Sequence, residues 1–219
     1  HCHIFCKGRV IKLGGKARLE RLDDLALLAI QGPKAAGAAA RVLGDAVATQ
    51  SFMTQAAVTW EGATLLVSRS GYSGEDGYEI SVPADKAEAL AKALLDQPEV
   101  EAIGLGARDS LRLEVGLCLY GHDIDTETTP VEAGLLWSIG KRRRSEGGFP
   151  GAPVIQKQIA HGVTRRRVGI LPDGRAPARE GTEVADESGN IIGKITSGGF
   201  GPSHGGPVAM GYVALDHAK

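Results

Sequence analysis

The sequence has little net charge, few cysteines and no long apolar run. Its 25 Lys and Arg residues balance 26 Asp and Glu residues, so no global field favours nucleic acid or an anionic membrane. Its apolar runs are shorter than the roughly 18 residues of a membrane span. The first residues, HCHIFCKGRVIKLGG, lack the apolar centre of a signal peptide. We expect a soluble globular protein in a reducing compartment, with no nucleic acid or membrane partner.

The cysteines do not form a disulfide framework. Cys2, Cys6 and Cys118 make an odd count without regular spacing, which argues against a secreted disulfide fold. The segment HCHIFC could contribute to a zinc site, but structural zinc usually takes paired ligands from two separated segments. We therefore expect no metal.

The first part of the chain predicts strands and helices in alternation. LALLAI at 25 to 30 is typical of a buried strand, and KAAGAAARVLG after Pro33 predicts a helix. Residues 56 to 69 predict a hairpin around Glu61 and Gly62, GYEISVP predicts a strand, and ADKAEALAKALLDQ predicts a helix. This order indicates an α+β fold of ferredoxin-like type, with helices on one face of an antiparallel sheet.

The pattern changes after about residue 160. RRRVGIL, GTEVAD, GNIIGKITSGG and GPVAMGYVAL are short strand patterns separated by glycine turns, which favour a small β-barrel or part of one. Residues 120 to 160 mix glycine, proline and charge. We therefore predict a domain boundary near residues 155 to 162.

The stretch SRSGYSGEDGYEIS at 68 to 81 allows three interpretations. A phosphate-binding glycine loop needs a helix after it, whereas here a period-two strand pattern follows and Glu75 and Asp76 would repel phosphate. A plain turn would use Gly71, Gly74 and Gly77 for positive φ and leave the two acids in solvent. Glu79 lies opposite the apolar face of the following strand, where an exposed edge position is the ordinary expectation.

Two charged segments follow. GLGARDSLRLEVGLCLYG predicts a helix beginning near Gly106, and its charges, including Arg108 and Arg112, could be surface decoration. The run Lys141, Arg142, Arg143 and Arg144 is ordinarily a solvated charge run. Taken alone, these patterns indicate a two-part soluble protein and do not assign a function.

Six separated blocks, in order, resemble the glycine cleavage T-protein family of aminomethyltransferases. They are GYSGEDGYEISVP, GLGARDSLRLEVGLCLYGHDID, TTPVEAGLLWSIGKRRR, FPGAPVI, RRRVGI, and ITSGGFGPS with VAMGYV. The resemblance implies an unmatched segment at 1–16, a ferredoxin-like folate-binding domain at 17–160 and an incomplete C-terminal β-barrel at 161–219. It also implies cytoplasmic location in bacteria and the mitochondrial matrix in eukaryotes.

The resemblance implies a reaction and its site residues. Members move a one-carbon unit from the aminomethyl-lipoyl arm of the H-protein to tetrahydrofolate, release ammonia and give 5,10-methylenetetrahydrofolate. Glu79 corresponds to the glutamate that holds the pterin, and Arg108 to the arginine that binds the folate tail. Tyr72 corresponds to an aromatic residue along the ligand. Because the H-protein is acidic, Lys141, Arg142, Arg143 and Arg144 are candidates for docking it.

The sequence departs from the family pattern in ways that leave two functions open. It has no counterpart of the catalytic aspartate, which in the family precedes the matched region, so we expect no catalytic residue here and no turnover by these 219 residues alone. The first hypothesis is therefore part of an aminomethyltransferase. The second is a folate-binding module without turnover, although the KGCYxGQE-type motif of relatives that maintain iron–sulfur proteins is absent.

Overall fold

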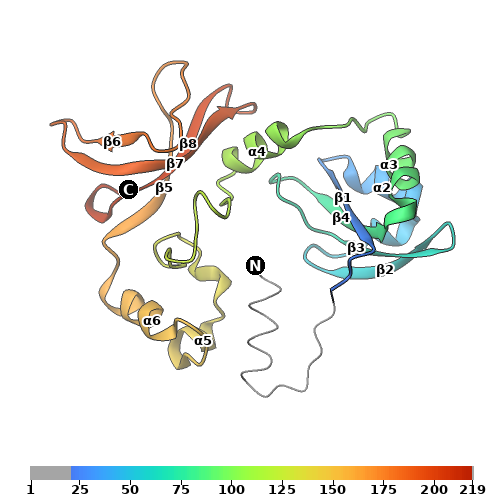
Figure 1. The fold of residues 1–219 in the computed structure, drawn as a ribbon, viewed down its shortest axis with the longest axis horizontal. Helices are drawn as coiled ribbons and strands as arrows, with labels where there is room; N and C mark the ends of the chain where they lie inside the picture. Colours follow the sequence, from blue (N-terminus) through green and yellow to red (C-terminus); the bar gives the residue numbers. More distant parts are fainter. Residues whose placement is uncertain (1–20, 219) are drawn as a thin grey trace. The chain divides into compact units, whose positions relative to one another are not determined.

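The structure, a computed structural model, describes residues 21–218, and the predictions for Cys2, Cys6 and the unmatched segment lie outside them. The chain folds as two compact units (Figure 1). Among the described residues, the first contains 21–71 together with Glu75–Ala102, and the second contains Tyr72–Gly74 and 103–218. The predicted domain boundary at residue 160 stays a prediction.

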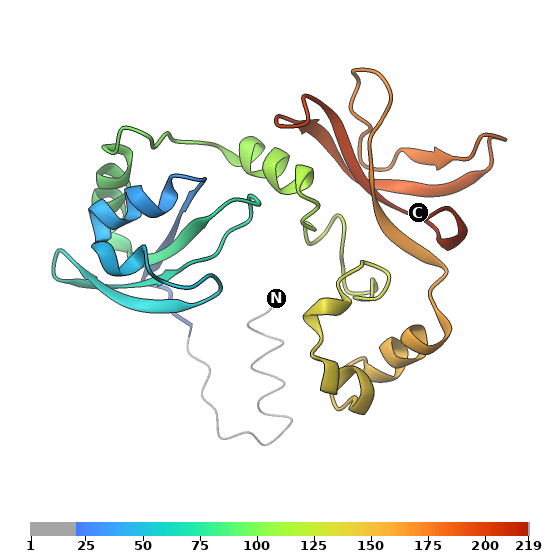
Figure 2. The same cartoon turned by 180° about the vertical axis from the view of Figure 1, so that it is seen from behind.

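The first unit is one antiparallel sheet with two helices. The strands follow the order β1-β4-β3-β2, so β4 lies between β1 and β3. The bounds are β1 Leu25–Gln31, α2 Ala35–Leu43, η1 Asp45–Val47, β2 Gln55–Trp60, β3 Ala63–Ser68, β4 Gly77–Pro83, η2 Ala84–Lys86 and α3 Ala87–Leu95. The helices α2 and α3, blue and green in Figure 2, cover one face of this sheet.

The alternation of β4 decides which face is buried. Tyr78, Ile80 and Val82 are fully buried and pack in the core with residues of α2 and α3, whereas Glu79 and Ser81 are half-buried on the other face. Successive side chains of a strand point to opposite faces, so the apolar set requires Glu79 to lie on the face away from the helices. This is the orientation that the sequence predicts.

The predicted hairpin is β2 and β3. Glu61 and Gly62 connect the strands with φ values of 45° and 75°. Two central residues with positive φ match the twist of the flanking strands, which is why glycine suits the second position. Helix α2 begins at Ala35, two residues after Pro33.

The second unit combines helices with a second antiparallel sheet of order β5-β8-β7-β6, coloured orange to red in Figure 1. The helices are α4 Leu105–Glu114, η3 Leu136–Ser138, α5 Lys141–Glu146, α6 Ala152–His161 and η4 Leu215–His217. The strands are β5 Arg165–Ile170, β6 Glu183–Ala185, β7 Ile191–Gly201 and β8 Gly206–Ala214. The predicted α+β class, with an antiparallel sheet in each part, is confirmed.

Two helices, α5 and α6, lie in the region that mixes glycine, proline and charge. Helix α6 begins after Gly151, which has a φ of 81°, and has a proline in its first turn, where the missing N–H costs nothing. Among residues 21–218, no helix is long and apolar enough to cross a membrane.

The glycines of β7 allow close packing in the second unit. A Cβ at Gly198 would lie 1.6 Å from the carbonyl oxygen of Ala178, so the loop before β6 crosses the strand at that residue. A Cβ at Gly199 would lie 3.4 Å from Leu113 of α4, and one at Gly201 would lie 3.0 Å from Glu114. The glycines of SGGFG therefore allow α4 and the loop to pack closely against β7.

Candidate functional site

The loop between β3 and β4 is anchored at its base by an ion pair. Arg69 donates to Asp76 through two hydrogen bonds, Nε to Oδ1 at 3.0 Å and Nη2 to Oδ2 at 2.7 Å. Its Nη1 also donates to the carbonyl oxygens of Ala48 and Gln50. The hydrogen bond from Arg69 holds the pKa of Asp76 below its ordinary value. The expectation that Asp76 is a solvated turn residue is therefore wrong.

The three glycines of this loop have different roles. Only Gly74 has positive φ, 82°, as a plain turn requires. Gly71 and Gly77 are needed because Gln31 lies against them: an added Cβ would be 1.8 Å and 2.4 Å from atoms of its amide. That amide donates to the carbonyl oxygen of Ser70 at 3.0 Å. The prediction that all three supply positive φ is wrong for Gly71 and Gly77.

Glu79 lies in the middle of a sheet. It is opposite Ala29 of β1 and Ser68 of β3, so the edge position that its pattern favours is wrong. The side chain is half-buried, and Ser70 Oγ donates to Glu79 Oε2 at 2.7 Å. A carboxylate fixed this way on a central strand presents two acceptor oxygens in a defined direction, which suits a ligand with two adjacent N–H groups.

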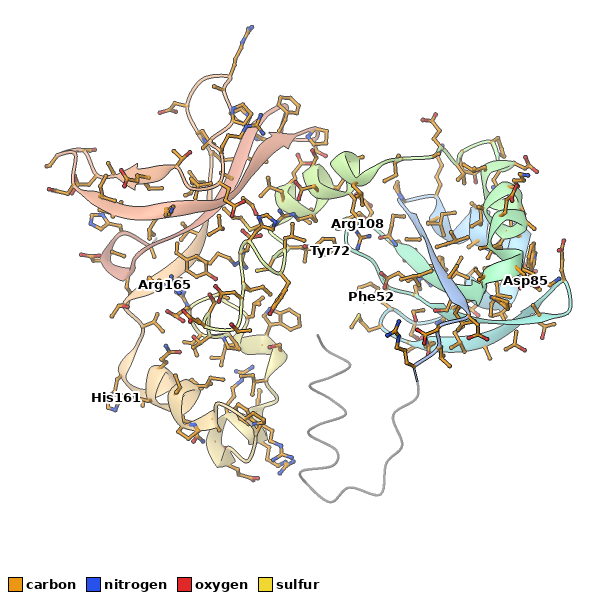
Figure 3. The ribbon with its side chains drawn as sticks, in the orientation of Figure 1. Phe52, Tyr72, Asp85, Arg108, His161 and Arg165 are labelled. Carbon is orange, nitrogen blue, oxygen red and sulfur yellow. The ribbon has the colours of Figure 1, made fainter. Side chains whose placement is uncertain are left out.

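Tyr72 and Arg108 form one cluster in the second unit (Figure 3). The guanidinium carbon of Arg108, on α4, lies 4.9 Å from the centroid of the Tyr72 ring, which is cation–π distance. The Tyr72 hydroxyl donates to the carbonyl oxygen of Cys118, and burial raises the pKa of this hydroxyl. Arg108 itself is exposed. The structure thus brings together two of the three predicted folate residues; the convergence of Glu79 with them stays a prediction.

A buried ion pair lies close to this cluster, and the sequence does not predict that its two charges are buried. Arg112 and Asp123 are 2% and 1% exposed, and Arg112 Nη1 donates to Asp123 Oδ2 at 2.6 Å. Arg112 therefore is not surface decoration. Burial alone would raise the pKa of Asp123, but hydrogen bonds from Thr196, the Leu119 N–H and Arg112 outweigh it and hold the pKa below its ordinary value.

The basic run Lys141 to Arg144 forms the short helix α5. Arg142 pairs with Glu146 at 2.8 Å. Arg144 Nε donates to the carbonyl oxygen of Ile139 at 2.7 Å, and Arg143 donates to the carbonyls of Gly147 and Gly148. Two of the arginines therefore help to fix the local backbone. Lys141 and Arg142 are exposed, and a docking role for the run stays a prediction.

A separate cleft of about 290 Å³ lies in the second unit between α4, β5 and β8. Its walls include Leu113, Arg167 and Met210, and none of the predicted site residues. Within the described part of the chain, no three His, Cys, Asp or Glu side chains are grouped as a metal site would require.

Two protein-family models match successive parts of the sequence. Residues 10–143 match the GCVT N-terminal domain, and residues 165–219 match the glycine cleavage T-protein C-terminal barrel domain. Mitochondrial aminomethyltransferases are similar: that of Solanum tuberosum is 50% identical over 208 residues, and that of Canis lupus familiaris 49% over 208 residues. Each alignment covers 94% of this chain and 51% of the relative.

A solved structure has the same fold. The glycine cleavage system aminomethyltransferase T from Bartonella henselae superposes with a TM-score of 0.90 at 43% sequence identity. The superposition covers 98% of this chain and 57% of that protein. The chain thus spans about half the length of the curated relatives it matches.

Proposed function

Because this chain belongs to the glycine cleavage T-protein family, we propose that it is the folate-binding part of an aminomethyltransferase. In the proposed reaction, the methylene carbon breaks its bonds to the lipoyl sulfur and to the amino nitrogen. It then forms bonds to N5 and N10 of tetrahydrofolate. The two protons lost from these nitrogens go to the lipoyl sulfur and to the departing ammonia. The products are the dithiol arm, ammonia and 5,10-methylenetetrahydrofolate.

The Tyr72–Arg108 cluster is the observation that carries this proposal. The Arg108 guanidinium lies over the Tyr72 ring and is exposed to solvent, so its N–H groups are available to carboxylates of the folate tail. The contact with the ring restricts the guanidinium, which reduces the entropy lost when a ligand binds. Tyr72 in turn is fixed through its hydroxyl to the Cys118 carbonyl.

Glu79 is proposed to bind the pterin. The pterin presents an amino group and a ring N–H side by side, and these match the two oxygens of a carboxylate. Ser70 Oγ orients the side chain by donating to Oε2. This role requires no catalysis by Glu79, since a general base must lie within about 3 Å of the proton that it removes.

Titration of the chain with tetrahydrofolate tests these roles. The substitution Glu79→Gln keeps the shape and removes the charge, and we expect the dissociation constant to rise about 10-fold to 100-fold. Asp186→Asn serves as a control, because Asp186 lies in an exposed turn where it accepts hydrogen bonds from Ser188 and Asn190. Equal affinity of the Glu79→Gln variant and the unchanged chain would refute the pterin role.

The alternative is a folate-binding module without turnover. It is favoured for the 219 residues alone because none of them corresponds to the aspartate that the resemblance places beside the reacting nitrogen. A positioned carboxylate contributes about 10²-fold to 10⁴-fold to such a transfer. We expect the chain to bind folate and release no ammonia from aminomethylated carrier. Ammonia release near the rate of a full-length relative would contradict this.

The proposed partners are the lipoylated H-protein and tetrahydrofolate, and the proposed location is the cytoplasm in a bacterium or the mitochondrial matrix in a eukaryote. Curated relatives named as mitochondrial support the second location. The exposed Lys141 and Arg142 are the proposed contact for an acidic carrier.

A further inference from the structure

The segment after α4 connects the buried ion pair to Tyr72. The Cys118 carbonyl, which accepts the Tyr72 hydroxyl, lies between two residues whose backbone groups are held by the ion pair. Arg112 Nη1 donates to the Leu117 carbonyl at 3.1 Å, and the Leu119 N–H donates to Asp123 Oδ2 at 2.9 Å. The position of the acceptor for Tyr72 therefore depends on Arg112 and Asp123.

The ion pair is itself fixed to the second sheet. Arg112 Nη2 donates to Ser197 Oγ at 2.9 Å, and Thr196 Oγ1 donates to Asp123 Oδ1 at 2.5 Å. Both hydroxyls belong to β7. The Tyr212 hydroxyl of β8 donates to the Asp123 carbonyl at 2.7 Å. Rigid strands thus determine where the segment from Leu117 to Asp123 lies.

Arg112 is also one helical turn from Arg108. The two residues are four apart on α4, so they lie on neighbouring turns of one helix. Arg112 Nε donates to Asp109 Oδ1 at 2.7 Å, which adds a bond between Arg112 and the residue next to Arg108. The ion pair therefore holds both members of the Tyr72–Arg108 cluster, one through α4 and one through the Cys118 carbonyl.

Burying this pair does not by itself favour folding. Two charges lose their hydration on burial, and apolar residues of similar volume often stabilise a protein as well or better. What apolar residues cannot provide is a set of directed bonds to the Leu117 carbonyl and the Leu119 N–H. The arrangement is therefore suited to holding a defined geometry for the neighbouring cluster.

We propose that Arg112 and Asp123 are positioning residues of the folate tail site, acting through the Tyr72–Arg108 cluster without touching the ligand. This inference rests on the proposed function, because it assumes that the cluster binds folate. It predicts that the effect of Asp123 on folate affinity requires Arg108.

A double-mutant cycle on the full chain tests this dependence. Tetrahydrofolate dissociation constants are measured for the unchanged chain, Asp123→Asn, Arg108→Ala and the double variant. We expect Asp123→Asn to weaken binding about tenfold in the unchanged background and to have no further effect when Arg108 is alanine. A purely structural role would give the same factor in both backgrounds, and that result would overturn the proposal.

Milder variants serve where Asp123→Asn does not fold. Ser197→Ala and Thr196→Val each remove one hydroxyl that holds the ion pair, and we expect each to weaken binding about threefold, again only when Arg108 is present. Ile155→Ala is the stability control, because it opens a cavity at a buried position of α6 and should leave folate affinity unchanged. Equal losses of affinity in Ile155→Ala and the hydroxyl variants would overturn the proposal.

The same titrations separate the two proposals. If the unchanged chain does not bind tetrahydrofolate, the proposed folate function fails, and the positioning role fails with it. If the unchanged chain and Arg108→Ala bind as the function requires but Asp123→Asn is additive with Arg108→Ala, only the positioning role fails.

Discussion

At the scale of single residues, the ion pair of Arg69 and Asp76 ties loop 69–77 to the chain at residues 48–50. The Arg69 side chain makes four hydrogen bonds, two to Asp76 and two to backbone carbonyls. Removal of the Asp76 charge leaves a half-buried guanidinium with fewer acceptors, so the loop that precedes Glu79 becomes less well fixed.

Asp76 gives a prediction about pH. Because the pKa of Asp76 is lower in the folded state than its ordinary value of 3.8, the pair stabilises the fold fully above that value and loses its effect as the pH falls below it. We expect Asp76→Asn to lower the free energy of unfolding by about 1 kcal/mol at pH 7. Urea unfolding at several pH values measures this.

The pH dependence distinguishes the ion pair from a simple packing defect. The unfolding free energies of the variant and the unchanged chain should approach each other as the pH falls below 3.8. Asp85→Asn is the control, because Asp85 lies in η2 of the same unit. A constant difference between Asp76→Asn and the unchanged chain from pH 7 to pH 3 would contradict the role of the charge.

At the scale of elements, the contact between β7 and the loop before β6 depends on Gly198. An alanine there would place its Cβ 1.6 Å from the Ala178 carbonyl oxygen, and neither group is a flexible side chain that could move aside. The strand or the loop must therefore shift. Since β7 also carries Thr196 and Ser197, such a shift reaches the Arg112–Asp123 pair.

We predict that Gly198→Ala lowers the free energy of unfolding by about 3 kcal/mol, because the added methyl group overpacks a backbone contact. Gly169→Ala in β5 is the matched control, since a Cβ there would meet no atom within 4 Å. Thermal unfolding of both variants provides the measurement. Equal midpoints for the two would show that the loop is not held against β7.

The elements also show what the sequence could and could not predict. The face of Glu79 was predictable, because Tyr78, Ile80 and Val82 alternate with it. The central place of β4 was not, because it depends on pairing with β1, more than 45 residues earlier in the chain. In the same way, the charges of Arg112 and Asp123 are visible in the sequence, but their burial depends on hydroxyls of β7, over 70 residues away.

At the scale of the whole molecule, charge is nearly balanced, so a charged partner must be attracted by a local group. Lys141, Arg142 and Arg143 are exposed, but Arg143, like Arg144, also donates to backbone carbonyls, whereas Lys141 and Arg142 can be changed without losing such a bond. The double substitution Lys141→Gln with Arg142→Gln therefore tests electrostatic attraction with little change to the fold.

We predict that this double variant associates more slowly with an acidic lipoyl carrier at low salt, by about threefold to tenfold. The difference should disappear at high ionic strength, where exposed charges are screened. Stopped-flow measurement with the carrier gives the rates, and Arg175→Gln, in an exposed loop, is the control for general charge. If the double substitution left the association rate at low salt unchanged, the role of α5 would be structural only.

The strand order of the first unit also has a kinetic consequence. Strands β2, β3 and β4 are consecutive in sequence and pair as neighbours. Strand β1 also pairs with β4, but α2, β2 and β3 lie between these two strands in the sequence. Closing that long loop costs entropy that the local pairings do not. We expect β1 to dock last in refolding, so in pulse labelling the amide protons that bond β3 to β2 and to β4 should become protected before those that bond β1 to β4. The sheet face that carries Glu79, which β1 completes at Ala29, would then form only in the last folding step.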